Sequence, residues 1–298
     1  MKSTLLIFTV MAGFSLPAQA LDSGATFLKI DTDARAVSMG SAYTALASGV
    51  GSIGYNPAGL SAASGVELGF SHANWIMDSM HDFAGVAVPM KTPGLVLGMG
   101  ITRFSNGSME SRGEDRSAGA NFSSYDQAVS LISARRVGGS RLGLAVKYIE
   151  SEIAGERANA VAVDLGLSRA LRGLPLTVGF SVQNLGTSMK YIDQKDPLPL
   201  SLSAGVMFSV VPGINLAMDL RRRVYDRQNS VSIGTEYGVL KGFALRTGYL
   251  MNNGLAGTRN KGLSAGAGLN IGGMGVDYAF TPFGELGNAQ RITLKTEF

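Results

Sequence analysis

The residues that could do chemistry are few and scattered along the chain. Its only two histidines, His72 and His81, lie close in sequence to Asp78 and Asp82. Such a set could ligate a metal or act as an acid–base pair for a serine nucleophile. The histidines lack the tight spacing of a metal site and no nucleophile is defined beside them, so we expect no metal and no catalytic residue. The chain also has no cysteine, which excludes disulfides, thiolate metal sites and thiol nucleophiles.

Two other patterns invite a ligand-binding interpretation. Residues 49–54 match the dinucleotide pattern G-x-G-x-x-G, but they lack the preceding strand and the βαβ unit that give those glycines their role, so we expect no cofactor. Arg221, Arg222 and Arg223 could bind phosphate or lipopolysaccharide, because arginine binds oxyanions well. On a strand, however, Arg222 points away from its two neighbours. We therefore favour ion pairs for Arg221 and Arg223 and a position near lipid headgroups for Arg222.

Residues 1–20 have the pattern of a cleaved secretory signal peptide. Lys2 supplies a positive start, residues 5–16 are apolar, and residues 18–20 (Ala-Gln-Ala) form a small-x-small cleavage site. The apolar stretch is shorter than the ~20 residues that a membrane-spanning helix needs. We therefore expect an exported protein that begins near Leu21 and, since it has no cysteine, carries no lipoprotein anchor.

The rest of the chain distributes its apolar residues by alternation. The sequence is 45% hydrophobic and 16% charged and contains 40 glycines. In residues 174–184, 230–239 and 263–271, apolar residues alternate with polar or small ones. A transmembrane β-barrel has this pattern because every second residue faces lipid and the others face the lumen. We predict an all-β protein, a transmembrane antiparallel β-barrel of the bacterial outer membrane; a secreted β-sandwich or propeller is the alternative.

The same segmentation predicts about fourteen strands, an even number as in single-chain outer-membrane barrels. Longer loops follow the odd-numbered strands, notably residues 105–123, 185–198 and 253–261, and short turns follow the even-numbered ones. This asymmetry is typical of the extracellular and periplasmic faces of such barrels. The last strand ends on Phe298, an aromatic residue that resembles the C-terminal signal of outer-membrane barrels. The expected strands begin near Val66, Asp82, Gly94, Ser124, Ser140, Ala158, Leu174, Pro199, Ile214, Asn229, Phe243, Gly262, Met274 and Ala289.

Residues 34–60 follow a different pattern from the strands. Residues 34–47 carry small apolar residues at helical spacing, and the segment ends in Asn-Pro-Ala-Gly-Leu at residues 56–60, a turn and helix-stop signal. A compact segment followed only by strands predicts a plug inside the barrel. We therefore divide the mature chain into a plug, residues 21–64, and a barrel, residues 65–298.

The strand positions expected to face inward combine small residues with charges. Small residues leave room for a backbone, which favours a filled lumen. The charges either line water or pair with one another and with the plug. They are Lys147, Asp164, Asp219, Arg221, Arg223, Glu236, Arg246, Asp277, Arg291, Lys295 and Glu297.

Residues 27–30, 34–47 and 56–60, together with residues 277–288, resemble the corresponding runs of the PorV/PorQ family, a branch of the FadL-like outer-membrane barrels. The Asn-Pro-Ala-Gly-Leu run is shared more broadly among FadL-like proteins, whereas the C-terminal run is closer to PorV/PorQ. The resemblance implies fourteen strands around an N-terminal plug. The plug residues that carry it are Arg35, Gly40, Tyr43, Asn56, Pro57 and Gly59.

Two expected external loops carry apolar residues that could form a hydrophobic binding site at the barrel mouth. The alternative is that these residues pack on each other or rest at the membrane interface, where tryptophan is common. The residues are Trp75, Ile76, Met77, Met80, Met189 and Tyr191.

Two non-enzymatic functions follow from the resemblance. A PorV-like barrel receives the C-terminal signal domains of proteins leaving through type IX secretion and passes them to surface attachment. A FadL-like barrel takes up hydrophobic small molecules past an N-terminal hatch, here residues 35–60. The first is our main expectation and the second its alternative; a scaffold for other envelope proteins stays open. The expected partners are outer-membrane lipid and lipopolysaccharide, secreted proteins or a hydrophobic small molecule, and no nucleic acid.

Overall fold

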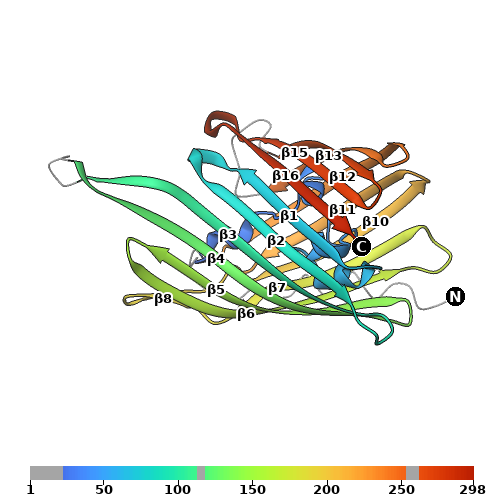
Figure 1. Ribbon diagram of the computed structural model, residues 1–298, viewed down its shortest axis with the longest axis horizontal. Coiled ribbons are helices and arrows are strands. Elements are labelled where there is room, and N and C mark those ends of the chain that lie inside the picture. Colours follow the sequence, from blue (N-terminus) through green and yellow to red (C-terminus); the bar gives the residue numbers. More distant parts are fainter. Residues whose placement is uncertain (1–22, 113–117, 253–261) are drawn as a thin grey trace.

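Fourteen antiparallel strands form a closed barrel in the computed structural model, which describes residues 23–112, 118–252 and 262–298 (Figure 1). Neighbouring barrel strands pair in chain order, and the first pairs with the last through the register Phe70↔Leu294. The predicted fold class, a fourteen-stranded barrel around a small N-terminal plug, is confirmed.

The barrel strands differ in length, and two further short strands form a separate hairpin, β8 (Met189–Tyr191) and β9 (Gln194–Asp196). The barrel strands are β1 (Glu67–Asn74), β2 (Met80–Pro89), β3 (Leu95–Arg112), β4 (Ala118–Val137), β5 (Ser140–Ile153), β6 (Glu156–Ala170), β7 (Leu176–Gly186), β10 (Ser201–Val211), β11 (Ile214–Arg223), β12 (Gln228–Leu240), β13 (Phe243–Asn252), β14 (Leu263–Ile271), β15 (Met274–Pro282) and β16 (Asn288–Glu297).

The expected strand starts lie within two residues of the observed ones, except for β4. The expected loop at 105–123 is wrong, because β3 continues to Arg112 and β4 begins at Ala118. This hairpin extends beyond the other strands (Figure 1). Its sequence there is polar at successive positions, so no apolar alternation marks it as strand. The expected loop at 253–261 lies outside the described residues.

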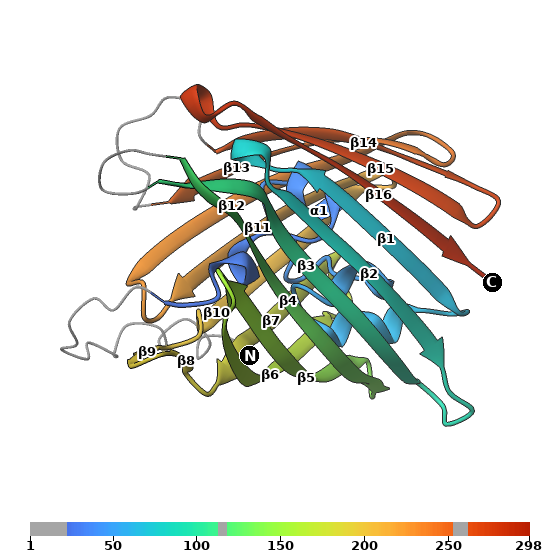
Figure 2. The same ribbon diagram turned by 60° about the vertical axis from the view of Figure 1, so that its left-hand side comes forward.

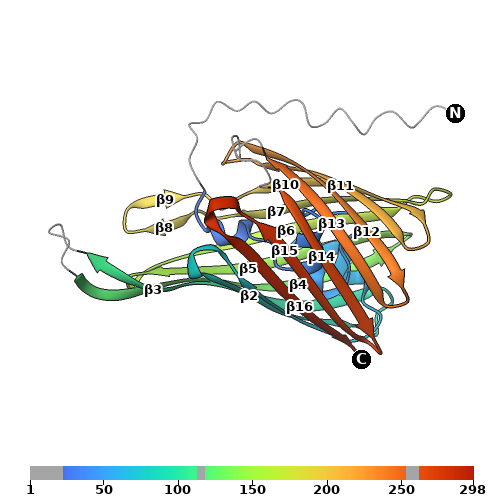
Figure 3. The same ribbon diagram turned by 90° about the horizontal axis from the view of Figure 1, so that it is seen from above.

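The barrel has two unlike ends. The loop end carries the β3–β4 hairpin, the β8–β9 hairpin and the short helices η4 (Ile76–Asp78) and η6 (Gly284–Leu286), whereas the turn end carries tight turns such as residues 138–139 and the C-terminal Phe298 (Figure 3). All barrel strands run between these two ends.

The outward face is apolar and the inward face is polar or small. In β5, Leu144 and Val146 are each 45% exposed, whereas Ala145 and Lys147, which alternate with them, are buried. This inverted pattern suits a wall with lipid outside and polar groups inside. No helix among the described residues is both long and apolar enough to cross a membrane.

The plug lies inside the barrel (Figure 2). The described part of the plug begins at the loop end, where the Ser23 backbone N–H donates to Asp226 at 3.1 Å, and descends to the turn end before β1 begins. The helix expected over residues 34–47 is too long, because α1 ends at Ser38 and Gly40 and Ser41 both have positive φ. The plug comprises η1 (Thr26–Lys29), α1 (Ala34–Ser38), η2 (Gly49–Ser52) and η3 (Pro57–Ala62).

Glycines line the inner wall where the plug backbone touches it. A Cβ on Gly248 of β13 would overlap the Met39 carbonyl carbon and the Gly40 nitrogen. Gly179 of β7 would place its Cβ 2.5 Å from the Thr44 carbonyl oxygen. The wall therefore accepts backbone only because these positions lack side chains.

Substituting Gly248 with alanine is expected to displace the plug and lower the melting temperature, because the added carbon meets backbone rather than a flexible side chain. Overpacking of this kind costs about 1–3 kcal/mol. The matched control is Gly275→Ala on β15, whose Cβ would have its nearest neighbour at 3.7 Å. Equal heat stability of the two folded barrels on semi-native gels would contradict the close contact.

Candidate functional site: two cavities separated by α1

The short helix α1 is defined by its two ends. The Asp33 side chain caps the N-terminus by accepting from the Arg35 N–H at 2.7 Å. After Ser38 the chain turns through Gly40, whose N–H donates to the Ser264 hydroxyl of β14 at 3.0 Å. At the other end, the Ala34 N–H donates to the Thr293 hydroxyl of β16 at 2.9 Å, so both ends of α1 are fixed against the barrel wall.

An outer cavity of about 300 Å³ lies at the loop end of α1. Trp75 lines it and stacks edge-to-face on Phe283, with ring centroids 5.1 Å apart. Val37 of α1 forms part of its floor. Its other apolar lining residues are Ile30 and Leu250, and its cationic ones are Lys29, Arg221 and Arg223.

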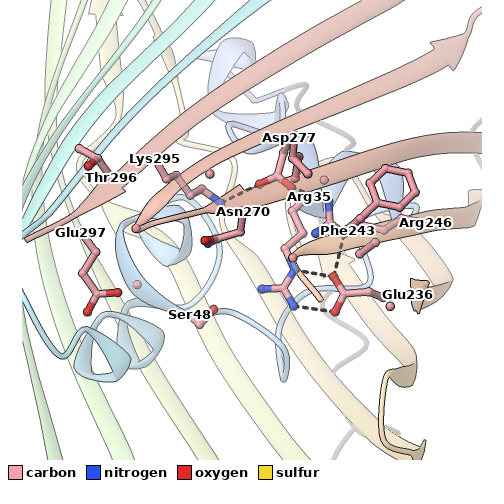
Figure 4. Close-up of a pocket in the computed structure, with 18 of the residues that line it drawn as sticks. Arg35, Ser48, Glu236, Phe243, Arg246, Asn270, Asp277, Lys295, Thr296 and Glu297 are labelled. Carbon is pink, nitrogen blue, oxygen red and sulfur yellow. Dashed lines mark hydrogen bonds and ion pairs between the residues drawn. The ribbon is translucent and has the colours of Figure 1, made fainter. Parts of the chain in front are cut away.

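An inner cavity of about 540 Å³ lies on the turn-end side of α1 (Figure 4). Arg35 of α1 lines it, together with the wall residues Arg246, Asp277 and Lys295. The two cavities share no lining residue, and α1 contributes Arg35 to one and Val37 to the other. The helix therefore separates an outer, more apolar cavity from an inner, charged one.

Six side chains of alternating charge hold α1 against the wall. Asp33 pairs with Lys295 at 2.6 Å, and Lys295 lies 3.5 Å from Asp277. Arg246 then bridges Asp277 at 2.5 Å and Glu236 at 2.7 Å. Arg35 closes the series with two hydrogen bonds to Glu236, both 2.8 Å (Figure 4). We call these six residues the charge ring, closed through the backbone of residues 33–35.

The plug side of this ring is electrostatically well defined. Burial alone lowers the pKa of the Arg35 guanidinium, but its ion pair and hydrogen bonds with the Glu236 carboxylate help to more than offset this, so the pKa lies above its ordinary value. Burial raises the pKa of the Tyr43 and Tyr55 hydroxyls, so both stay neutral. The Arg35 guanidinium also lies 5.9 Å from the Tyr43 ring centroid.

Two further ion pairs hold the plug near the loop end. Lys29 pairs with Asp226 at 2.8 Å, and Asp31 lies 4.0 Å from Arg221. Arg221 and Arg223 line the outer cavity, whereas Arg222 does not.

The six plug residues singled out in the sequence all help to seat the plug. Arg35 belongs to the charge ring, and Gly40 lies against β13. Tyr43 is fully buried, with its ring centroid 5.2 Å from that of Tyr55. Asn56 caps η3 and donates to the Thr44 carbonyl at 2.8 Å. Pro57 is the first residue of η3, and a Cβ on Gly59 would lie 2.5 Å from the Ala47 carbonyl oxygen.

The expected mouth residues do not form one site. Trp75 lines the outer cavity, while the next residue, Ile76, is half-buried. Met77 is 82% exposed, and Met80 lies on the outward face of β2, opposite in direction to the buried His81.

Met189 does not take part in a binding site at the mouth; of the two arrangements left open for the external loops, it has the packed one. It is fully buried in an apolar cluster with Phe27 of η1, and Tyr191 packs against the same cluster. Because β8 folds back over η1, these side chains fasten the plug rather than face solvent.

The two histidines lie on opposite faces of the wall. His72 faces outward and its Nδ1 lies 2.6 Å from Asp82, whereas His81 faces inward, 2.9 Å from the Arg291 guanidinium. They therefore cannot act on one ligand. Across residues 23–112, 118–252 and 262–298, no cluster of three His, Cys, Asp or Glu side chains could hold a metal.

Most of the site's assembly could not be predicted from the sequence, although Trp75 was recognised as a mouth residue. Ile30, Val37, Leu250 and Phe283 were not recognised as cavity residues, because single apolar residues are common in any sequence. The charges of the ring were recognised as inward-facing, but not their pairing. Arg35 and Glu236 are 201 residues apart, so local spacing carries no information on their contact.

No family model and no curated protein matches this chain. Among solved structures, the toluene transporter TodX of Pseudomonas putida superposes with a TM-score of 0.65 at 14% identity, covering 93% of this chain and 98% of that one. A Pseudomonas aeruginosa FadL homologue gives a TM-score of 0.57 at 10% identity, covering 89% and 97%. The chain therefore has the fold of the FadL/TodX-like outer-membrane β-barrels. Membership of the PorV/PorQ branch stays a prediction.

Replacing Glu236 with glutamine is expected to destabilise the protein, because Arg35 loses its carboxylate partner and Arg246 keeps only Asp277. Removing one partner of a buried ion pair typically costs about 3–5 kcal/mol. Urea unfolding of the refolded barrel measures the change, and Glu285→Gln in the exposed η6 serves as control. Identical midpoints for both variants would show that the charge ring does not stabilise the plug.

Proposed function

We propose that this protein is an outer-membrane channel that admits small hydrophobic molecules from the loop end, past α1, to the turn end. The loop end then faces the exterior and the turn end the periplasm. The observation that carries this proposal is the division of the lumen into two cavities by one short helix. The likeness in fold to a toluene transporter and to a FadL homologue supports the same direction.

The outer cavity has the chemistry of an entry site. Its apolar residues, among them Ile30, Trp75 and Phe283, offer a place for a hydrophobic body. Its volume of about 300 Å³ lies at the lower end of the range for small-molecule pockets. The inner cavity is lined by charged residues, so it would bind a hydrophobic solute only weakly. This difference between the two cavities favours release of the solute towards the turn end.

The part of the plug that moves is α1 rather than the whole segment. The lower plug packs Val50, Ile53 and Leu60 against apolar residues of β2 to β5, and exposing these residues to water would cost free energy. In contrast, α1 contributes only Ala36 to an apolar cluster and is tied to the wall by Asp33 and Arg35, of which Arg35 borders the inner cavity, where water can replace its partner. Opening at α1 therefore exposes less apolar surface than expulsion of the plug.

Two engineered disulfides separate these movements, and the chain has no native cysteine to interfere. Thr32→Cys with Gly54→Cys joins carbons 3.4 Å apart and ties the start of α1 to the lower plug. Val50→Cys with Gly69→Cys joins carbons 3.6 Å apart and ties only the lower plug to β1. We expect oxidation of the first pair to block toluene uptake by cells expressing the protein, and oxidation of the second to leave it unchanged.

Reduction should restore uptake in the first variant, which controls for misfolding. Block by both disulfides would mean that the whole plug must leave. Uptake equal to that of cells without the protein, in wild type and in Glu236→Gln alike, would overturn the channel proposal for this solute class.

Docking of secreted proteins is a second candidate, supported by the β3–β4 hairpin, which projects beyond the other strands at the loop end (Figure 1). Such a hairpin offers a partner a raised edge. We expect a docking protein to bring exported proteins that share a C-terminal domain through purification in mild detergent, as detected by mass spectrometry. A stoichiometric hydrophobic molecule without any protein partner would instead favour the channel.

A further inference from the structure

Five arginines gather at the turn end of strands β4 to β7. Arg135 and Arg136 lie near the end of β4, and Arg141 lies near the start of β5. Arg169 is the last residue but one of β6, at the turn end, and Arg172 follows in the connection to β7. Arg136 is the cross-strand partner of Arg141, and Arg169 pairs with Ser140 beside it. We call these five residues the arginine cluster.

The strand segments that carry this cluster are free of acidic residues. Residues 129–149 and 165–182 contain no aspartate or glutamate. The one other cation there, Lys147, is already paired with Asp164 at 2.6 Å, deeper in the barrel. Like charges directly opposite each other on neighbouring strands are destabilising, as for Arg136 and Arg141. The cluster is therefore a place where an external anion would stabilise the fold.

The arginines of the cluster point in different directions. Arg136 occupies an inward-facing position of β4, and its guanidinium donates to the Ser61 carbonyl of the plug at 3.3 Å. Arg135 and Arg169 have outward parity and are exposed, as is Arg172 in the connecting turn. Two guanidinium groups are thus available on the outer surface of the barrel, and a third, that of Arg172, is exposed in the adjoining turn.

The outward arginines adjoin the apolar surface of the wall. Arg135 is the cross-strand partner of Leu142, which in turn pairs with Leu167. Leu131, at the next outward position above Ser133 on β4, is 61% exposed. A ligand that binds these arginines while covering the leucines must combine an anionic head with an apolar body.

We propose that Arg135, Arg169 and Arg172 bind the phosphate of an anionic glycerophospholipid in the leaflet at the turn end, with an acyl chain along Leu131 and Leu142. Arginine suits this role because its planar group donates paired hydrogen bonds to phosphate oxygens. An anionic lipid is preferred over phosphatidylethanolamine, since the ammonium group of the latter is repelled by the remaining arginines. The proposal requires the barrel to lie in a membrane but does not depend on transport.

The turn end offers matched controls on other strands. Lys91 lies in the β2–β3 turn and Lys241 in the β12–β13 turn, and both are exposed. The double variant Lys91→Gln/Lys241→Gln removes the same charge as Arg135→Gln/Arg169→Gln. A third variant, Arg135→Lys/Arg169→Lys, keeps the charge and removes the planar groups. Heat-modifiable migration on gels selects folded protein for each variant.

Native mass spectrometry of the purified barrel with added phosphatidylglycerol, phosphatidylethanolamine or diacylglycerol tests the proposal. We expect phosphatidylglycerol to bind most tightly, and the Arg135→Gln/Arg169→Gln variant to weaken it about tenfold or more, as loss of charge-assisted hydrogen bonds predicts. The lysine control should bind as wild type does, and the arginine-to-lysine variant should be intermediate. Equal phosphatidylglycerol binding by the Arg135→Gln/Arg169→Gln and Lys91→Gln/Lys241→Gln variants would contradict a lipid site at the arginine cluster.

Soluble phosphate distinguishes the source of the anion. Glycerol 3-phosphate in excess should leave the bound phosphatidylglycerol in place, since it cannot cover the leucines. Complete displacement by glycerol 3-phosphate would overturn the lipid assignment in favour of a free phosphate. Toluene uptake by the Arg135→Gln/Arg169→Gln variant is a separate readout, because the cluster lies away from both cavities.

Discussion

The architecture depends on close contact between the plug backbone and a glycine-lined wall. A backbone inserted into a barrel brings N–H groups that must find acceptors away from bulk water. The small wall positions let the plug approach, and nearby polar side chains then accept its hydrogen bonds. Asp219 accepts from the Tyr43 and Thr44 N–H groups at 2.9 and 2.7 Å, and Glu67 accepts from Val50 at 2.7 Å. The plug can therefore lie inside the barrel because small wall residues make room for its backbone and polar wall side chains accept its hydrogen bonds.

The charge ring gives α1 a different energetic character from the lower plug. Buried ion pairs add little net stability over an apolar contact, but half of a broken pair is costly. If α1 leaves, Glu236 keeps Arg246, and Asp277 keeps both Arg246 and Lys295. Only Asp33 and Arg35 lose their partners, and Arg35 already borders the inner cavity, where water can solvate it. The wall half of the ring therefore stays paired in either position of the helix.

Much of the barrel could be predicted from the sequence, because lipid and lumen impose a two-residue period on every crossing strand. The prediction failed where that constraint ends. The β3–β4 hairpin extends past the crossing region and is polar at successive positions, so its strands look like a loop. The helix at Ala34 stops at Ser38 because Gly40 must press against Gly248, a contact between distant segments. Whether Met189 is packed or accessible could not be predicted, because its loop position said nothing of the Phe27 side chain beneath it.

The two halves of the barrel wall contact different parts of the plug. Strands β2 to β6 hold the apolar base of the plug and the cluster around Phe27, and the arginine cluster lies at their turn end. Strands β12 to β16 carry the charge ring and contribute most of the lining of the inner cavity. Apolar contacts hold the plug on one side, and charged side chains whose partners water can replace hold it on the other. The plug can therefore move away from the wall on the charged side only. An opening at α1 would leave the strand pairing and the lipid-facing surface of the opposite half unchanged, so the barrel would stay closed around it.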